Sequence, residues 1–388
     1  MTVYESLGVP GVLNGVGPAT RLGGLPLHPE VWKAMQEALA TSVRMDVLER
    51  AAGKRLAELL GVPSVYVTSG ASAALFLATA ATMARGRADL IDRLPDTTGM
   101  KHKVIIQAAH RDPYDRAAVA AGATLVTIGY PESTHAGELE RVLDEDVAAV
   151  LYRPGRHGNL LDLASTSAIA HAHGVPVMID GAMFVPPIDR LQEFFAQGAD
   201  LVAVSGGKGF RGPQASGLLC GTPEFIDVIA LQHQDMDERE ATWPPNYDGS
   251  QLNTPPRHGI GRPMKVGREQ IVGLLTAVER YVADPGSDEQ AGLVELDAVE
   301  AVVRAHGAIG VERQLDPALH VEYLRLDMGA AGTTADAVVL ALAAQPTPAY
   351  LGESDAWRNV LTVNTMALAP GEGALLGEAI VRAVEGTR

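Results

Sequence analysis

The chain has a single cysteine and no long hydrophobic run. One cysteine among 388 residues, Cys220, excludes an internal disulfide framework and a metal site built from several cysteines. This residue lies in the apolar run GLLCG, which favours a buried core position over a nucleophile. The longest weakly polar stretch, ASAALFLATAATMA, is long enough for one buried helix but too short to cross a bilayer.

Basic residues are in deficit as well. The 31 Lys and Arg against 47 Asp and Glu give a net charge of −16, and no basic block offsets this acidity. We therefore expect neither a nucleic-acid partner nor an anionic membrane partner. The N-terminal stretch MTVYESLGVPGVLNG lacks the basic segment and apolar core of a signal peptide, so we expect a cytoplasmic protein.

Length and patterning predict two packed units. We expect an N-terminal arm over residues 1–45, a large domain over 46–265, a linking helix over 266–286 and a small α+β domain over 287–388. The polar segment 233–262 contains two Pro-Pro pairs and reads as a long loop, which in a compact protein is usually functional or covers an interface.

Short apolar runs alternate with helical patterns between residues 64 and 220. This alternation predicts an α/β fold with a mostly parallel seven-stranded sheet that helices cover on both faces. The expected strands are 64–68, 103–107, 124–128, 147–152, 175–179, 200–204 and 216–220. The expected helices between them are 73–86, 138–146, 163–174 and 191–198.

Three of these strands are followed by unusual residues, and ligands of open α/β sheets bind at the carboxyl ends of strands. Ser69, Gly70, Ala71 and Ser72 follow the first strand and open a helix, where free backbone N–H groups suit a phosphate. Asp180 follows the fifth strand, and Ser205-Gly-Gly-Lys208 follows the sixth. Taken singly, each has an ordinary alternative: a helix cap, a turn-capping aspartate and an exposed hairpin lysine.

Together the three segments match the needs of pyridoxal 5'-phosphate (PLP). That cofactor needs a lysine for a Schiff base, an acid at its ring nitrogen and hydrogen-bond donors for its phosphate. A lysine that reacts with an aldehyde must be partly neutral, and burial in a positively biased pocket lowers its pKa. The glycines around Lys208 would let the backbone pack closely.

Longer stretches carry a family resemblance. TSGASAAL, MIDGA, SGGKGFRGPQASGLL and GIGRPMKVGREQIVGLL occur in this order, together with TRLGG, HRDPYDRA and LVTIGYPESTHAGELE. Over most of residues 10–285 the chain resembles fold type I PLP enzymes, in the branch with bacterial selenocysteine synthases and D-glucosaminate-6-phosphate ammonia-lyases. The resemblance implies a fold type I PLP-transferase architecture with a small C-terminal α+β domain.

The resemblance also implies roles for individual residues. Lys208 would form the Schiff base and Asp180 would pair with the pyridine nitrogen. His110 would stack on the ring or assist proton transfer, although it could instead cap the following helix. The residues expected to bind the cofactor are Ser69, Gly70, Ala71, Ser72, Asp180, Ser205, Lys208 and Arg262, and those expected to bind substrate are Arg21, Lys265 and Arg358.

Arginines 153 and 211 also lie where an anion could be held. Because active sites of this fold type borrow groups from a neighbouring subunit, the resemblance implies a homodimer or higher homo-oligomer. No metal is expected, since His171 and His173 are two apart on a helix and point to different faces of it, most simply towards solvent.

Several reactions share these cofactor residues. The resemblance favours α,β-elimination from a small-molecule amino substrate, an amino acid or amino-sugar acid, with Lys208 taking the Cα proton. A selenocysteine synthase-like transferase fits less well, because the chain begins almost at the catalytic unit and its charge of −16 suits tRNA badly. An aminotransferase or a racemase stays open, with His110 or Tyr114 as a racemase's second acid/base. A non-catalytic PLP-fold protein would be expected to lose Lys208 or Asp180, and a dinucleotide-binding protein would need the missing GxGxxG motif.

Overall fold

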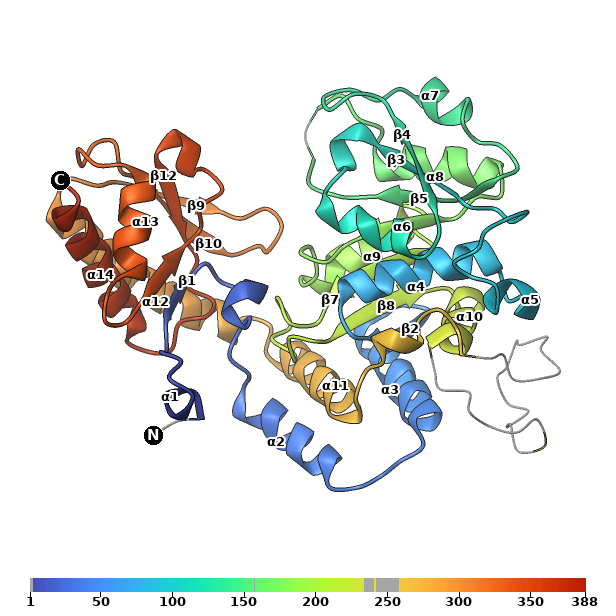
Figure 1. Ribbon diagram of the computed structural model, residues 1–388, viewed down its shortest axis with the longest axis horizontal. Helices are drawn as coiled ribbons and strands as arrows, with labels where there is room; N and C mark the ends of the chain where they lie inside the picture. Colours follow the sequence, from blue (N-terminus) through green and yellow to red (C-terminus); the bar gives the residue numbers. More distant parts are fainter. Residues whose placement is uncertain (1–2, 157, 234–240, 242–257) are drawn as a thin grey trace. The chain divides into compact units, whose positions relative to one another are not determined.

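The computed structural model describes residues 3–156, 158–233, 241 and 258–388. It divides the chain into two compact units, Leu27–Glu279 and a second formed by Met1–Pro26 with Arg280–Arg388 (Figure 1). Of the expected loop 233–262, residues 234–240 and 242–257 lie outside the described residues. Among the described helices, none has the length and apolar character needed to cross a membrane.

A mixed, mostly parallel seven-stranded sheet forms the core of the larger unit, as predicted. Its order is β2-β8-β7-β6-β5-β3-β4, and only β8 runs antiparallel to its neighbours. The strands are β2 Ser64–Thr68, β3 Lys103–Gln107, β4 Thr124–Ile128, β5 Val147–Tyr152, β6 Val177–Asp180, β7 Leu201–Ser205 and β8 Gly217–Gly221. Each lies within two residues of a predicted strand, which confirms the α/β class.

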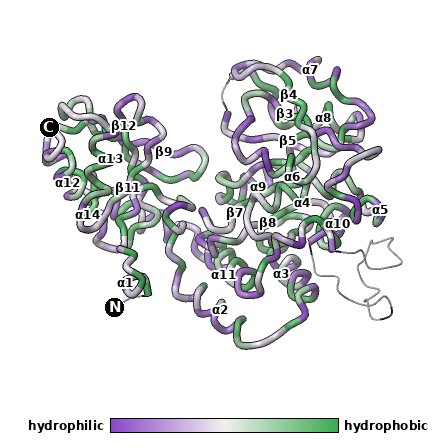
Figure 2. Tube along the Cα trace, viewed as in Figure 1, coloured by the Kyte–Doolittle hydropathy of each residue, from purple (hydrophilic) through white to green (hydrophobic). Residues whose placement is uncertain are grey.

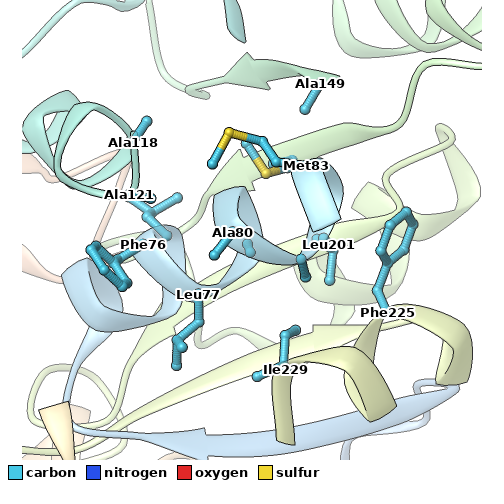
Figure 3. Packing of buried hydrophobic residues seen from close by; sticks show 14 of the residues in the cluster. Phe76, Leu77, Ala80, Met83, Ala118, Ala121, Ala149, Leu201, Phe225 and Ile229 are labelled. Carbon is cyan, nitrogen blue, oxygen red and sulfur yellow. The ribbon is translucent and has the colours of Figure 1, made fainter. Parts of the chain in front are cut away.

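Helices cover the sheet. The helices of the larger unit are α2 Pro29–Leu39, α3 Met45–Leu60, α4 Ala71–Ala84, α5 Ala88–Ile91, α6 Arg116–Ala120, α7 Ala136–Glu140, α8 Leu163–Ala172, α9 Ile188–Ala196 and α10 Pro223–His233, together with α11 Arg268–Ala283, in which the unit ends at Glu279. Hydrophobic residues predominate along α4 (Figure 2), and every residue of this helix except Ser72 is buried. Its apolar character has a simple cause, since α4 packs against the sheet, α6 and α10 (Figure 3).

Helix α7 is shorter than the predicted helix 138–146. It ends at Glu140, and the residues that follow lead to the start of β5, beside the start of β3. There the carbonyl of Asp146 accepts hydrogen bonds from the backbone N–H groups of His102 and Lys103, at 2.8 and 3.0 Å. Residues 141–146, which were predicted to continue the helix, therefore end in a contact with the start of β3.

The smaller unit has an α+β architecture. A three-stranded antiparallel sheet, in the order β12-β10-β9, carries most of its core. The elements are β9 Gly310–Leu315, β10 Glu322–Asp327, β12 Val360–Val363, α12 Ser287–His306, α13 Ala335–Ala343 and α14 Glu372–Gly386, with the short α1 Val3–Ser6.

The two ends of the chain meet in this unit. Strand β1 (Leu13–Gly15) pairs in parallel with β11 (Ala349–Leu351), and Leu13 belongs to the buried core of the unit. The first 26 residues therefore group with the C-terminal unit, whereas the sequence pattern suggested an arm over 1–45. The expected linking helix 266–286 is α11, which ends at Ala283, just before Pro285.

One carboxyl group in the core of the larger unit is costly. Glu49 of α3 is 4% exposed; its Oε2 accepts the backbone N–H of Val67 at 3.3 Å, and its Oε1 has no partner among the described residues. Burial raises the pKa of Glu49 from 4.5 to about 8. The residue also lines a cavity of about 530 Å³ between α3, β2 and α10, at the amino end of β2.

This pKa predicts how stability changes with pH. The folded protein binds more protons than the unfolded chain between pH 4.5 and about 8, so stability should fall as the pH rises through that window. Glu49→Gln should therefore raise the melting temperature at pH 9 by about 2–4 °C or more and flatten its dependence on pH. Glu58→Gln, which alters a half-exposed neighbour lining the same cavity, should leave the profile unchanged. Parallel profiles of wild type and Glu49→Gln would contradict the account.

Candidate active site

The strands β2, β6 and β7 run in the same direction, so their carboxyl ends lie at the same end of the sheet. These ends carry the predicted segments with Ser69, Asp180 and Lys208. Gly217, the first residue of β8, pairs with Thr68 on one side and with Ser205 on the other. The segments that follow β2 and β7 therefore start on either side of β8. On the next strand, Asp180 pairs with Ala203 of β7, so it lies near the start of the lysine loop.

The loop that carries Lys208 is closed by its own backbone. The N–H of Gly206 donates to the carbonyl of Ser216 at 3.0 Å, and the N–H of Gly212 donates to the carbonyl of Gly206 at 2.8 Å. The carbonyl of Lys208 accepts from the N–H of Arg211 at 2.9 Å. A side chain at Gly209 would collide with Pro186. The glycines thus allow a tight loop that holds the lysine backbone in place.

The start of α4 lies directly beside β8. A Cβ atom on Gly217 would lie 2.6 Å from the carbonyl carbon of Gly70 and 2.9 Å from the amide nitrogen of Ala71, so only glycine fits there. At Gly70 itself, a Cβ atom would meet nothing within 4 Å. Open space therefore borders Gly70, the residue before this 14-residue helix, and a helix N-terminus is a place where an anion can bind.

The serines expected at the phosphate differ in their surroundings. The hydroxyl of Ser69 donates to the carbonyl of Met264 at 2.9 Å, so its proton is already engaged within the protein. Ser72 is exposed, and Ser205 is partly buried at the end of β7. The hydrogen bond of Ser69 also brings the GRPMKVG segment, which contains Arg262 and Lys265, to the start of α4.

Asp180 is buried, Lys208 is partly buried, and the charge of each acts on the other. Burial lowers the pKa of Lys208, and the charge of Asp180 opposes this shift. Burial also raises the pKa of Asp180, which is 8% exposed, and the backbone N–H of Ala182 at 3.2 Å partly offsets that shift. Each group is thus shifted towards its neutral form, as expected for reactive groups in a desolvated site.

An ion pair that was not predicted from the sequence acts electrostatically on Lys208 and Asp180. Arg153, directly after β5, forms a salt bridge with Asp112, and both side chains are largely buried. The charge of Arg153 lowers the pKa values of Asp180 and Lys208, while that of Asp112 raises both. Their motifs, HRDP and LYRPG, each follow a predicted strand, and that position was the only available signal.

His110 lies at the end of the 3₁₀ turn Ala108–His110 that follows β3. Its Nδ1 accepts the backbone N–H of Arg153 at 3.4 Å, and its ring meets that of Tyr152 edge to face at 4.5 Å. The cap of the next turn is Asp112, whose side chain accepts from the N–H of Tyr114 at 2.7 Å, so the capping alternative for His110 is wrong. Burial and the nearby arginines lower the pKa of His110 to about 4, so the ring is neutral at pH 7.

The remaining predicted residues are spread over the molecule. Arg21 pairs with Glu353 at 2.9 Å, and Arg358 stacks on Trp357 at 4.5 Å; all four belong to the smaller unit. Lys265 is exposed.

Cys220, His171 and His173 lie where the sequence suggested, the cysteine in the core and the histidines at the surface. Cys220 is fully buried, which raises its pKa to about 12 and confirms that it is a core residue. His171 and His173 are exposed, and His171 contacts Asp200 at 2.8 Å. No cluster of three or more potential metal ligands occurs among the described residues.

The residues at this end of the sheet fit PLP. A buried carboxyl can face the ring nitrogen, a partly buried amine of lowered pKa can react with the aldehyde, and the amides at the start of α4 can take the phosphate. Asp180 stands out because the hydrogen bond from Ala182 and the charges of Arg153 and Lys208 do not fully offset the cost of burying its charge. A protonated ring nitrogen would supply a further positive partner.

Comparisons with known proteins agree with this geometry. The aminotransferase class-V family matches residues 36–234. The D-glucosaminate-6-phosphate ammonia lyase of Salmonella typhimurium is 27% identical, over 96% of this chain and 95% of the relative. The 5'-C-glycyluridine monooxygenase-decarboxylase of a Streptomyces species is 30% identical, over 98% of this chain and 91% of the relative.

A solved structure of D-glucosaminate-6-phosphate ammonia-lyase superposes with a TM-score of 0.81 at 26% identity, covering 100% of this chain and 99% of that one. These findings confirm the predicted resemblance, the fold type I architecture and the dependence on PLP, and they agree with the predicted lyase class. The chain belongs to the aminotransferase class-V family and is a PLP-dependent enzyme of fold type I.

Proposed function

We propose that the enzyme eliminates the β-hydroxyl of a 2-amino-3-hydroxy acid, including amino-sugar acids, and releases ammonia and a 2-oxo acid. The observation that carries the proposal is that Lys208 and the buried Asp180 follow adjacent strands and that desolvation shifts the pKa of each group towards its neutral form. The relative named as an ammonia lyase, similar over nearly its whole length, supports this reaction class.

Lys208 is the proposed acid/base group. When bound, PLP supplies an aldehyde that joins to the substrate amine and a ring that takes up electrons from Cα. The Nζ atom of Lys208 can accept the Cα proton because burial lowers its pKa, so more of it is neutral near pH 7. The same atom can then pass a proton to the departing hydroxyl, which leaves as water. Hydrolysis consumes one water and releases ammonia, so the net reaction balances.

Asp180 is proposed to hold a proton at the ring nitrogen. Its Oδ1 is oriented by the N–H of Ala182, and burial favours a shared proton over an isolated carboxylate. For the phosphate we propose the first amides of α4, the hydroxyl of Ser205 and the charge of Arg262. His110, neutral and held by the N–H of Arg153, is proposed to lie against the ring.

Arg153 is the arginine we propose for the carboxylate of the substrate. Among the described residues, its charge acts on Lys208, Asp180 and His110 alike, and Asp112 fixes its guanidinium. A planar guanidinium can bind a carboxylate through two parallel hydrogen bonds. The roles predicted for Arg21, Lys265 and Arg358 stay predictions, as do a homodimeric state and a cytoplasmic location.

A second candidate reaction has its own support. The relative with 30% identity is named a monooxygenase-decarboxylase that acts on a glycyl-substituted uridine. On that reading, the group at Cα lost first would be the carboxylate rather than a proton.

The products distinguish the two candidates. We expect purified enzyme, incubated with a panel of 3-hydroxy amino acids and phosphorylated amino-sugar acids, to release equal amounts of ammonia and 2-oxo acid without consuming oxygen. Release of carbon dioxide with consumption of oxygen would instead favour the second reaction. A Lys208→Ala sample serves as the control for non-enzymatic breakdown.

A further inference from the structure

A buried chain of hydrogen bonds connects the end of α10 to the start of α4. The hydroxyl of Tyr66 lies 2.9 Å from Nδ1 of His233, and Nε2 of His233 lies 2.9 Å from the carbonyl oxygen of Met264. The same carbonyl accepts the hydroxyl of Ser69 at 2.9 Å. Tyr66 and His233 are 3% and 4% exposed, so water competes little for these bonds.

The direction of the bonds follows from chemistry. A carbonyl oxygen can only accept, so Nε2 of His233 carries the proton and Nδ1 accepts from the Tyr66 hydroxyl. Burial lowers the pKa of His233, which keeps the ring in this neutral form. The Tyr66 hydroxyl therefore selects the tautomer that can bind Met264.

The segment that contains Met264 is also held by other contacts at the end of α10. The N–H of Gly261 donates to the carbonyl of Gln232 at 3.0 Å, and Ile260 and Met264 pack against the core of the larger unit. These contacts dock the turn, and among the hydrogen bonds of the described residues it is the Met264 carbonyl that joins the turn to Ser69. A carbonyl that accepts two hydrogen bonds fixes both donors relative to each other.

We propose that Tyr66 and His233 are positioning residues, which hold the Met264 carbonyl and so fix the turn Arg262–Met264, with the charge of Arg262, beside the start of α4 at the phosphate end of the cofactor site. The inference rests on the proposed assignment of the α4 N-terminus to the phosphate. Neither residue contacts the cofactor in this account, so their effect should be confined to recognition of the phosphate group.

Discrimination between PLP and pyridoxal, which lacks the phosphate, tests this directly. Binding of each to cofactor-stripped protein can be followed by visible absorbance. We expect His233→Leu to weaken PLP binding about tenfold while leaving pyridoxal binding nearly unchanged, since the Met264 carbonyl loses one of its two donors and the turn that carries Arg262 is held less firmly. Tyr66→Phe should produce a smaller loss in the same direction. His233→Gln should restore most of the preference, because its amide N–H can replace Nε2.

Controls separate this role from general stability. Thr82→Val removes a buried hydroxyl elsewhere in α4, one that donates to the carbonyl of Thr79 at 2.9 Å, and should not alter the preference for PLP. Equal losses of PLP and pyridoxal binding in His233→Leu and Tyr66→Phe would overturn the positioning role, as would full retention of the preference. If wild-type protein itself bound pyridoxal as tightly as PLP, the phosphate assignment would fail first.

Discussion

Replacing Lys208 with alanine should reduce turnover by roughly 10⁴-fold, the upper range for loss of a positioned acid/base. The loss has two physical sources. The variant lacks the amine that joins the cofactor aldehyde, and it lacks the base at Cα. Lys208→Arg should be almost as impaired, because a guanidinium stays protonated and cannot accept the proton. Turnover is measured as ammonia released under saturating substrate.

The matched control for this variant is Lys101→Ala. Lys101 lies just before β3, at the opposite end of the sheet, and its Nζ contacts the carbonyl of Val147 at 3.5 Å. This change should leave turnover within about twofold, as usual for surface changes away from the site. If Lys208→Ala retained more than a tenth of wild-type activity, Lys208 could not be the base.

Asp180→Asn should reduce turnover by roughly 10²–10³-fold, the range seen when one preorganised electrostatic partner is removed. An amide cannot keep the ring nitrogen protonated, so the ring would take up less charge from Cα. The same variant should be at least as stable as wild type when both lack the cofactor. Burial raises the pKa of Asp180, so the ionised carboxylate destabilises the cofactor-free fold at neutral pH, and the isosteric amide removes that cost.

The prediction is specific because Asp180→Asn should lose turnover without losing stability. Asp115→Asn is the control, because Asp115 is equally buried in the same unit but is salt-bridged to Arg111. That change should lower the melting temperature and leave the absorption spectrum of the bound cofactor unaltered. A destabilised cofactor-free Asp180→Asn protein, or one with normal turnover, would contradict the assignment.

The sequence predicted the parallel sheet well for a physical reason. Central strands such as β3 and β5 are buried on both faces and read as continuous apolar runs, KVIIQ and VAAVLY, each bounded by helical patterns. The three strand ends with Ser69, Asp180 and Lys208 could be found because a local motif follows each strand. Their convergence then follows from the topology of parallel sheets.

Features that depend on long-range contacts were missed. Strand β1 has only three residues and becomes a strand by pairing with β11, more than 300 residues away in the sequence. Helix α7 stops early because of bonds made to the start of β3. In the site, the salt bridge of Asp112 and Arg153 and the bond of His233 to Met264 join separate segments, and no local pattern shows which residue pairs with which.

The identity of the lysine that binds PLP tests the central claim most directly. Purified protein is reduced with borohydride, its absorption spectrum is compared before and after, and the modified peptide is mapped by mass spectrometry. We predict a yellow protein whose reduced adduct lies on Lys208, in the peptide containing SGGKGF. An adduct on another lysine such as Lys265, or a protein that stays colourless and unmodified with added PLP, would contradict the account.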